Sequence, residues 1–94
     1  MVRITADFYQ AVAQGKLQEA EAWLEAEKSK PTTPGHDKRW ADHRERELFR
    51  VYCARRDWIS AKRVVESSIF NSSRQGRIRR LKQLSGRPYH QISS

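Results

Sequence analysis

The chain has 94 residues, a formal net charge of +8 and a mixture of 37% hydrophobic with 32% charged side chains. It is polar for a globular domain, yet too apolar and too aromatic to be wholly disordered. No apolar run approaches the roughly 18–20 residues that span a bilayer, and residues 1–3 lead into a helical pattern rather than a signal-peptide core. We therefore expect one small cytoplasmic domain, 1–94, with no membrane contact.

The chain contains a single cysteine, which excludes an intrachain disulfide. Cys53 follows Tyr52 on an apolar helical face, whereas a reactive thiol needs an electropositive, partly exposed setting. The residue is predicted to be a small buried core side chain in a reducing compartment.

An internal repeat organises the chain. Residues 7–25 and 48–66 follow one pattern, 41 positions apart, in which an apolar helical run meets a short break and a second run follows. The matched positions are Phe8 with Phe49, Ala13 with Ala54, Leu17 with Trp58, Ala20 with Ala61 and Leu24 with Val65. The repeat predicts two antiparallel helical hairpins.

The first hairpin is expected at residues 5–28. Its first helix begins at Thr5, whose hydroxyl caps free amides, and ends near Gly15. Its second helix runs from Leu17 to Lys28 with an apolar face at helical spacing. Two prolines and a glycine then mark an exposed linker, 29–36.

The second hairpin is expected at residues 37–70. Its first helix starts between Asp37 and Trp40 and continues to Arg55, and its charged early part is interpreted as a solvated face with pairs such as Asp42 and Arg46. Asp57 is predicted to cap the next helix. The sequence 71–73, Asn-Ser-Ser, is predicted to end that helix.

A basic helix and tail follow at residues 72–94. The helix is expected from Arg74 to Leu84, with Ile78, Leu81 and Leu84 forming a buried apolar stripe. The last six residues are expected to fray. Gly86 and Pro88 act as stop signals. The predicted fold is all-α: two antiparallel helical hairpins, or four helices, plus a short basic C-terminal helix.

The hairpins resemble tetratricopeptide-like helical repeats over roughly residues 5–68. In the second copy Leu48, Tyr52, Ala61 and Val65 fall at the spacing of that pattern, and the first copy keeps Ala20 and Leu24. The chain departs from the pattern in its period of 41 rather than about 34 residues, and in phenylalanines where glycine is preferred. The resemblance implies a scaffold that binds peptides or partner helices on a concave face.

Charge is distributed unevenly along the chain. The last 28 residues hold six basic side chains and no acidic one. Such asymmetry favours a polyanionic partner, either an acidic protein surface or the phosphates of RNA or DNA. The candidate anion-binding or nucleic-acid-binding residues are Arg55, Arg56, Lys62, Arg63, Arg74, Arg77, Arg79, Arg80 and Lys82.

Tryptophan supplies a second candidate surface. Trp23 and Trp58 lie on apolar faces and are interpreted as core residues. Trp40 stands outside the repeated block among charges, and either contacts a protein partner together with Arg39 and Arg44 or folds back onto the helix at 17–28.

Catalytic, metal and cofactor sites have no support in the sequence. His36 and His43 lie seven apart without zinc-like spacing, and no phosphate loop or nucleophile elbow appears. The leading interpretation is a non-enzymatic module that binds a protein or peptide with an acidic surface. The alternative is an RNA-binding or DNA-binding protein, and self-association through an uncovered apolar face stays open.

Overall fold

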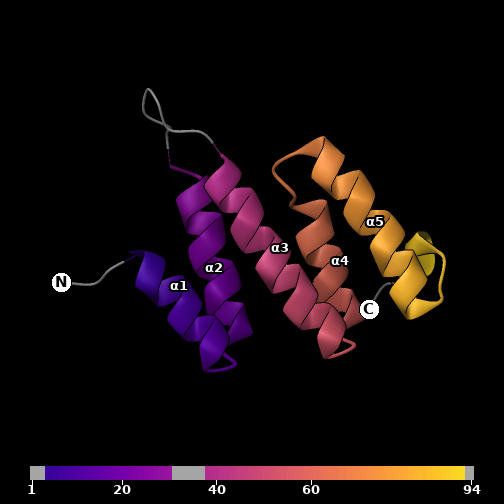
Figure 1. Ribbon diagram of the computed structural model, residues 1–94, viewed down its shortest axis with the longest axis horizontal. Coiled ribbons are helices and arrows are strands. Elements are labelled where there is room, and N and C mark those ends of the chain that lie inside the picture. The colour runs from indigo at the N-terminus through magenta and orange to yellow at the C-terminus, as the bar shows by residue number, and fades with distance from the viewer. Residues whose placement is uncertain (1–3, 31–37, 93–94) are drawn as a thin grey trace. The chain divides into compact units, whose positions relative to one another are not determined.

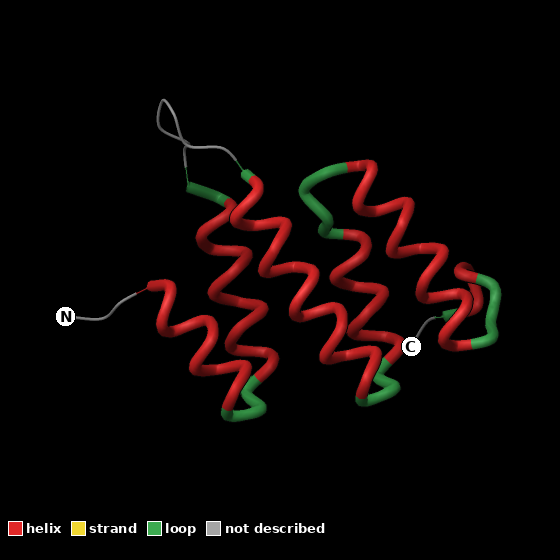
Figure 2. The backbone as a smooth tube through the Cα atoms, in the orientation of Figure 1, coloured by secondary structure: helices red, strands yellow, loops and turns green. Residues whose placement is uncertain are grey.

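The structure, a computed structural model, describes residues 4–30 and 38–92, with side chains from Phe8 onward. The described part is helical, contains no strand and so confirms the all-α prediction (Figure 2). Its helices are α1 (Ile4–Ala13), α2 (Leu17–Lys28), α3 (Arg39–Ala54), α4 (Trp58–Glu66), α5 (Asn71–Ser85) and the 3₁₀ turn η1 (Tyr89–Gln91). None of them combines the length and the apolar character that crossing a membrane requires.

The chain forms two compact units, residues 1–37 and residues 38–94. The linker expected at 29–36 lies mostly outside the described residues, as does the Thr5 side chain that was expected to cap α1. The expectation of a single domain stays a prediction.

In the first unit, α1 and α2 form an antiparallel hairpin (Figure 1). Phe8 is fully buried, and its ring lies 5.5 Å from that of Trp23, centroid to centroid. Leu17, Ala20 and Leu24 are also buried, as their three- and four-residue spacing predicted. The hairpin is thus held by one apolar face from each helix.

The turns of the two hairpins have the same geometry. Gly15 and Arg56, which are counterparts in the repeat, both adopt the left-handed conformation, with φ of 79° and 60°. The amide of the following residue then bonds to a carbonyl five residues back, at 2.8 Å from Lys16 and 2.9 Å from Asp57. This pairing is the usual way in which a helix ends on a left-handed residue. The predicted breaks therefore reverse the chain in the same way in both copies.

The two hairpins differ in how their second helices begin. Lys16 and Asp57 precede α2 and α4 with similar backbone angles, φ −87°, ψ 67° and φ −88°, ψ 77°. The Asp57 carboxylate accepts a hydrogen bond from the Ser60 amide at 3.2 Å, which confirms its predicted capping role. Lys16 has no side-chain acceptor to offer, and α2 has no such cap.

In the second unit, α4 packs antiparallel against both α3 and α5 (Figures 1 and 2). The buried apolar residues of this second unit include Leu48, Tyr52, Val64, Val65, Leu81 and Ile92. These positions recur at three- and four-residue spacing on α3 and α4, as an amphipathic helix requires. α3 and α5 both pack against α4, and they contact each other less extensively than either contacts α4.

The predicted boundary between α4 and α5 is wrong. α4 ends at Glu66, and Asn71 begins α5 instead of ending α4. The Ser68 hydroxyl donates to the Val64 carbonyl at 3.2 Å, and the Ile69 amide donates to Glu45 at 3.2 Å. The Ser68 hydroxyl and the Glu45 carboxylate thus bond to main-chain groups that would otherwise bond within the helix, and α4 ends early.

The predicted fraying of the last six residues is also wrong for the part that is described. Gly86, with φ of 70°, ends α5, and residues 89–91 form the turn η1. Ile92 is fully buried, and the Lys62 ammonium lies 4.7 Å from the centre of the Tyr89 ring. Burial and the Glu66 carboxylate raise the pKa of Tyr89 to about 12. The segment is therefore packed onto α4 and α5.

Candidate anion-binding groove

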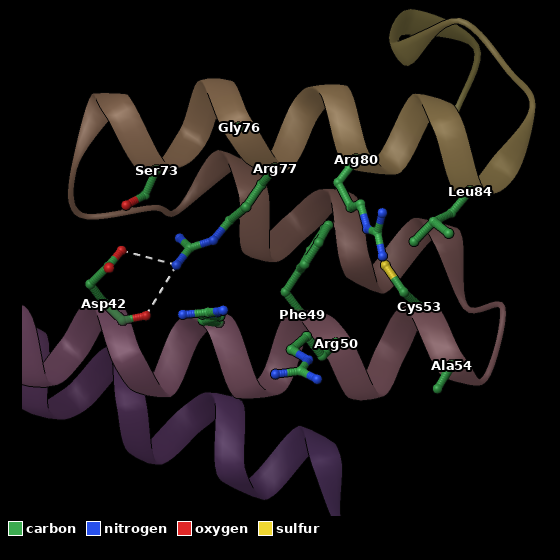
Figure 3. A pocket seen from close by; sticks show the side chains of 11 residues that line it. Asp42, Phe49, Arg50, Cys53, Ala54, Ser73, Gly76, Arg77, Arg80 and Leu84 are labelled. Atoms are coloured by element: carbon green, nitrogen blue, oxygen red, sulfur yellow. Dashed lines mark hydrogen bonds and ion pairs between the residues drawn. The ribbon is translucent and has the colours of Figure 1, made fainter.

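A groove of about 740 Å³ lies within the second unit, between α3 and α5 (Figure 3). α3 contributes one wall and α5 the other, because both helices pack on α4 and leave space between themselves. The lining residues are Asp42, Arg46, Phe49, Arg50, Cys53 and Ala54 from α3, and Ser73, Gly76, Arg77, Arg80 and Leu84 from α5.

Arg77 and Asp42 meet in the groove wall, and their ion pair belongs to a largely buried network (Figure 3). Arg77 reaches from α5 and donates from Nη1 to Glu45 Oε1 at 3.1 Å and to Ser68 Oγ at 2.9 Å. Its Nη2 donates to the carbonyl and carboxylate oxygens of Asp42 at 3.0 Å and 2.9 Å. Arg77 is 7% exposed and Glu45 is fully buried. This network ties α5 and the loop after α4 to α3.

The network corrects two expectations about these charges. Asp42 was expected to pair with Arg46 on a solvated face, but it pairs with Arg77 from another helix. Arg77 was expected to meet an anionic ligand, but its guanidinium is buried against carboxylates of the same chain. Residues 32 and 35 positions apart meet here, and helical spacing within one segment cannot show such a pairing.

Three other guanidiniums surround the groove without internal partners. Arg46, Arg50 and Arg80 are exposed, and among the described residues none of them forms a hydrogen bond or an ion pair. Arg46 and Arg50 stand one helical turn apart on α3, and Arg80 faces them from α5. Together they make the groove electropositive.

Sequence reasoning found Arg80 but missed Arg46 and Arg50. Arg46 was interpreted as the partner of Asp42, which is taken by Arg77 instead. The available signal was the four-residue spacing of the two arginines on either side of Phe49. That Arg46 and Arg50 line a groove opposite α5 depends on the tertiary fold, which the spacing within α3 does not show.

The floor between the arginines is apolar. Phe49 is 4% exposed and Cys53 is buried, as predicted. Burial raises the pKa of the Cys53 thiol, and the Arg80 charge partly opposes this effect. Leu84, expected on a buried stripe, is 44% exposed in the groove wall. A partner with both apolar and anionic groups would match such a surface.

Gly76 lies in the interior of α5 and lines the groove. A Cβ atom added there would meet nothing within 4 Å, and its φ is not in the left-handed range. Glycine inside a helix costs about 0.8–1 kcal/mol relative to alanine. Within the part of the chain that the structure describes, neither packing nor backbone conformation requires this glycine.

The other predicted cations are spread over several surfaces. Arg55 and Arg56 are exposed at the turn between α3 and α4. Arg79 and Lys82 are exposed on α5, turned away from Arg80 by about 100° and 200° around the helix. These four residues lie outside the groove wall.

Besides Arg77, three of the predicted cations are engaged within the protein. Lys62 covers the Tyr89 ring, as described above. Arg63 donates to Ser60 Oγ at 3.2 Å, and Arg74 donates to the Ser68 carbonyl at 3.3 Å. The structure therefore does not gather the nine predicted cations into one patch.

The predicted protein contact lies at the start of α3. Arg39 is exposed, whereas Trp40 and Arg44 are half-buried. The Arg44 guanidinium lies 5.4 Å from the centre of the Trp40 ring and donates to the Trp40 carbonyl at 3.2 Å. Trp40 and Arg44 thus contact each other directly.

Among the described residues, no group of three or more His, Cys, Asp or Glu side chains is arranged to hold a metal ion, and His36 lies outside those residues. No protein-family model, no curated protein and no solved structure matches this chain.

Proposed function

We propose that the protein is a non-enzymatic binding module whose groove between α3 and α5 takes an acidic, partly apolar segment of a partner protein. The observation that carries the proposal is the set of three exposed guanidiniums, Arg46, Arg50 and Arg80, around an apolar floor. Charged hydrogen bonds to carboxylates are stronger than neutral ones, and arginine forms them in a fixed two-pronged geometry.

The groove favours a peptide over a nucleic acid. Its volume is in the range of about 300–1,000 Å³ that suits a small ligand or a few side chains. Bases are commonly held by stacking on exposed aromatic rings, and the aromatic ring in this wall, Phe49, is buried. Leu84 and Cys53 instead offer contact to aliphatic side chains.

The repeat architecture supports the same proposal. Two hairpins with matched turns and matched buried faces are consistent with the helical-repeat scaffold that the sequence resembles, and such scaffolds use their surfaces for binding. Arg39, Trp40 and Arg44 at the start of α3 are proposed as a secondary contact. They belong to the helix that forms one groove wall.

A peptide-display selection on the immobilised full chain tests the proposal. Recovered peptides are expected to be rich in Asp and Glu with interspersed Leu, Ile or Phe. The double variant Arg50→Glu/Arg80→Glu should weaken their binding by about tenfold or more, measured by fluorescence anisotropy.

The matched control is Arg79→Glu/Lys82→Glu, which makes the same change in net charge on the other side of α5. If both double variants lost peptide affinity equally, only net charge would matter, and the groove would not be the binding site. Labelled RNA and DNA are tested in the same way at about 50 and 200 mM salt. If either bound with an affinity that falls steeply with salt and that the Arg79→Glu/Lys82→Glu variant lowers, nucleic-acid binding would replace the proposal.

A further inference from the structure

We infer that the occupant of the groove is an acidic α-helix whose main chain packs directly against α5 at Gly76. This inference rests on the proposed function and specifies the partner's conformation and the residue that selects it. The first argument is Gly76 itself, because this interior helical glycine lines the groove and none of the residues that the structure describes requires it.

Gly76 and Ser73 stand three residues apart on the groove face of α5. Because serine is small and glycine has no side chain, the groove face of α5 is low over this turn, just before the bulkier Arg77 and Arg80. Helices approach to about 8–10 Å according to the side chains at the contact, so a glycine allows the closest approach. A partner backbone laid over Gly76 would remain within reach of Arg80 on the next turn.

Hydrogen bonding argues for a helix over an extended segment. A buried extended peptide needs acceptors for its amides, and the acceptor side chains in the groove wall are Asp42 and Ser73, near one end. The remaining polar groups of the wall are guanidiniums, which only donate. A helix satisfies its own amides and presents carboxylates to these donors.

The spacing of the arginines fits a helical partner. Arg46 and Arg50 are four residues apart on α3, which is about 6 Å along the helix axis. Acidic residues four apart on a partner helix have the same rise, so two carboxylates can meet two guanidiniums in register. The partner's apolar residues on the adjacent stripe would then face Phe49 and Leu84.

The test uses the tightest acidic peptide from the display selection, in its original form and with proline at its central position. Proline should abolish helix formation and reduce affinity by at least about tenfold. The Gly76→Ala variant should raise the Tm by about 4–8 °C, since alanine favours the helix, while its affinity for the same peptide falls about tenfold.

Gln75→Ala is the control, because Gln75 is exposed and points away from the groove on the same helix. It should leave peptide affinity unchanged. Unchanged affinity in Gly76→Ala, or tolerance of the central proline, would overturn the inference while the arginine variants still tested the proposed function. A selection without acidic enrichment would remove the proposed function itself.

Discussion

The hairpins α1–α2 and α3–α4 turn in the same way but differ in what they bury. Among the described side chains, Phe8, Leu17, Ala20 and Leu24 form the buried set of the first, and all are apolar. The second buries Glu45, which stands where the first copy has Ile4 in the sequence. The repeat thus encodes the turn and the apolar face, whereas the buried charge depends on the helix that follows, α5, and its Arg77.

The largest expected effect comes from breaking the buried charge network. Arg77→Met should lower the free energy of unfolding by about 3–5 kcal/mol, because Glu45 stays buried without its cation. Urea denaturation followed by circular dichroism measures this loss. Arg79→Met, an exposed neighbour on α5, is the control and should change stability by less than about 0.5 kcal/mol.

The double variant Glu45→Met/Arg77→Met should recover much of the loss, since apolar residues can replace a buried pair. If Arg77→Met and Arg79→Met were equally mild, the network would contribute little to stability and the contrast between the hairpins would disappear.

A smaller effect is expected at the two left-handed turn residues. Gly15→Ala should destabilise the first hairpin by about 1–2 kcal/mol, because a side chain opposes the positive φ. The exchange Arg56→Gly removes that strain but also a favourable cation at the carboxyl end of α3, so its gain is smaller, about 0.5 kcal/mol.

Chemical denaturation of each variant and of the original chain gives both values. If Gly15→Ala left the free energy of unfolding unchanged, the first turn would have relaxed out of the left-handed conformation. The two turns would then be equivalent only in their hydrogen bonds.

The smallest effect is expected at the helix caps. Asp57→Ala should cost about 1 kcal/mol, because the Ser60 amide loses its acceptor. Lys16→Ser should add a similar amount to the first hairpin, since serine there forms a capping box with Glu19. Residue-specific hydrogen exchange of the amides in the first turns of α2 and α4 resolves the two effects. Asp57→Ala should lower the protection of these amides and Lys16→Ser should raise it. If both variants changed the protection in the same direction, the cap assignment would be contradicted.

The hairpins and their breaks were predictable because they depend on local signals. Spacing of apolar residues placed Ala20, Leu24, Ala61 and Val65 on buried faces, and Asp57 was identified as a cap from residue type alone. Such features need only neighbours within a few positions of the sequence.

The groove depends on contacts between distant segments. Whether Arg77 is a ligand contact or an internal ion pair is decided by Glu45 and Asp42, more than 30 positions away. Once Asp42 is taken by Arg77, Arg46 is left exposed toward the groove, so one long-range pairing determines the roles of several arginines. Charge patterns along single helices do not contain this information.

The position of Cys53 gives the protein an intrinsic reporter of groove occupancy. It is the sole thiol of the chain, and it lies in the wall between Arg50 and Arg80. Because burial raises the pKa of Cys53, the thiolate is scarce at neutral pH and alkylation of the free protein is slow. A helix seated in the groove would cover the sulfur and slow alkylation further. The rate of this alkylation, measured by mass spectrometry on the protein without any substitution, therefore reports how much of the groove is filled.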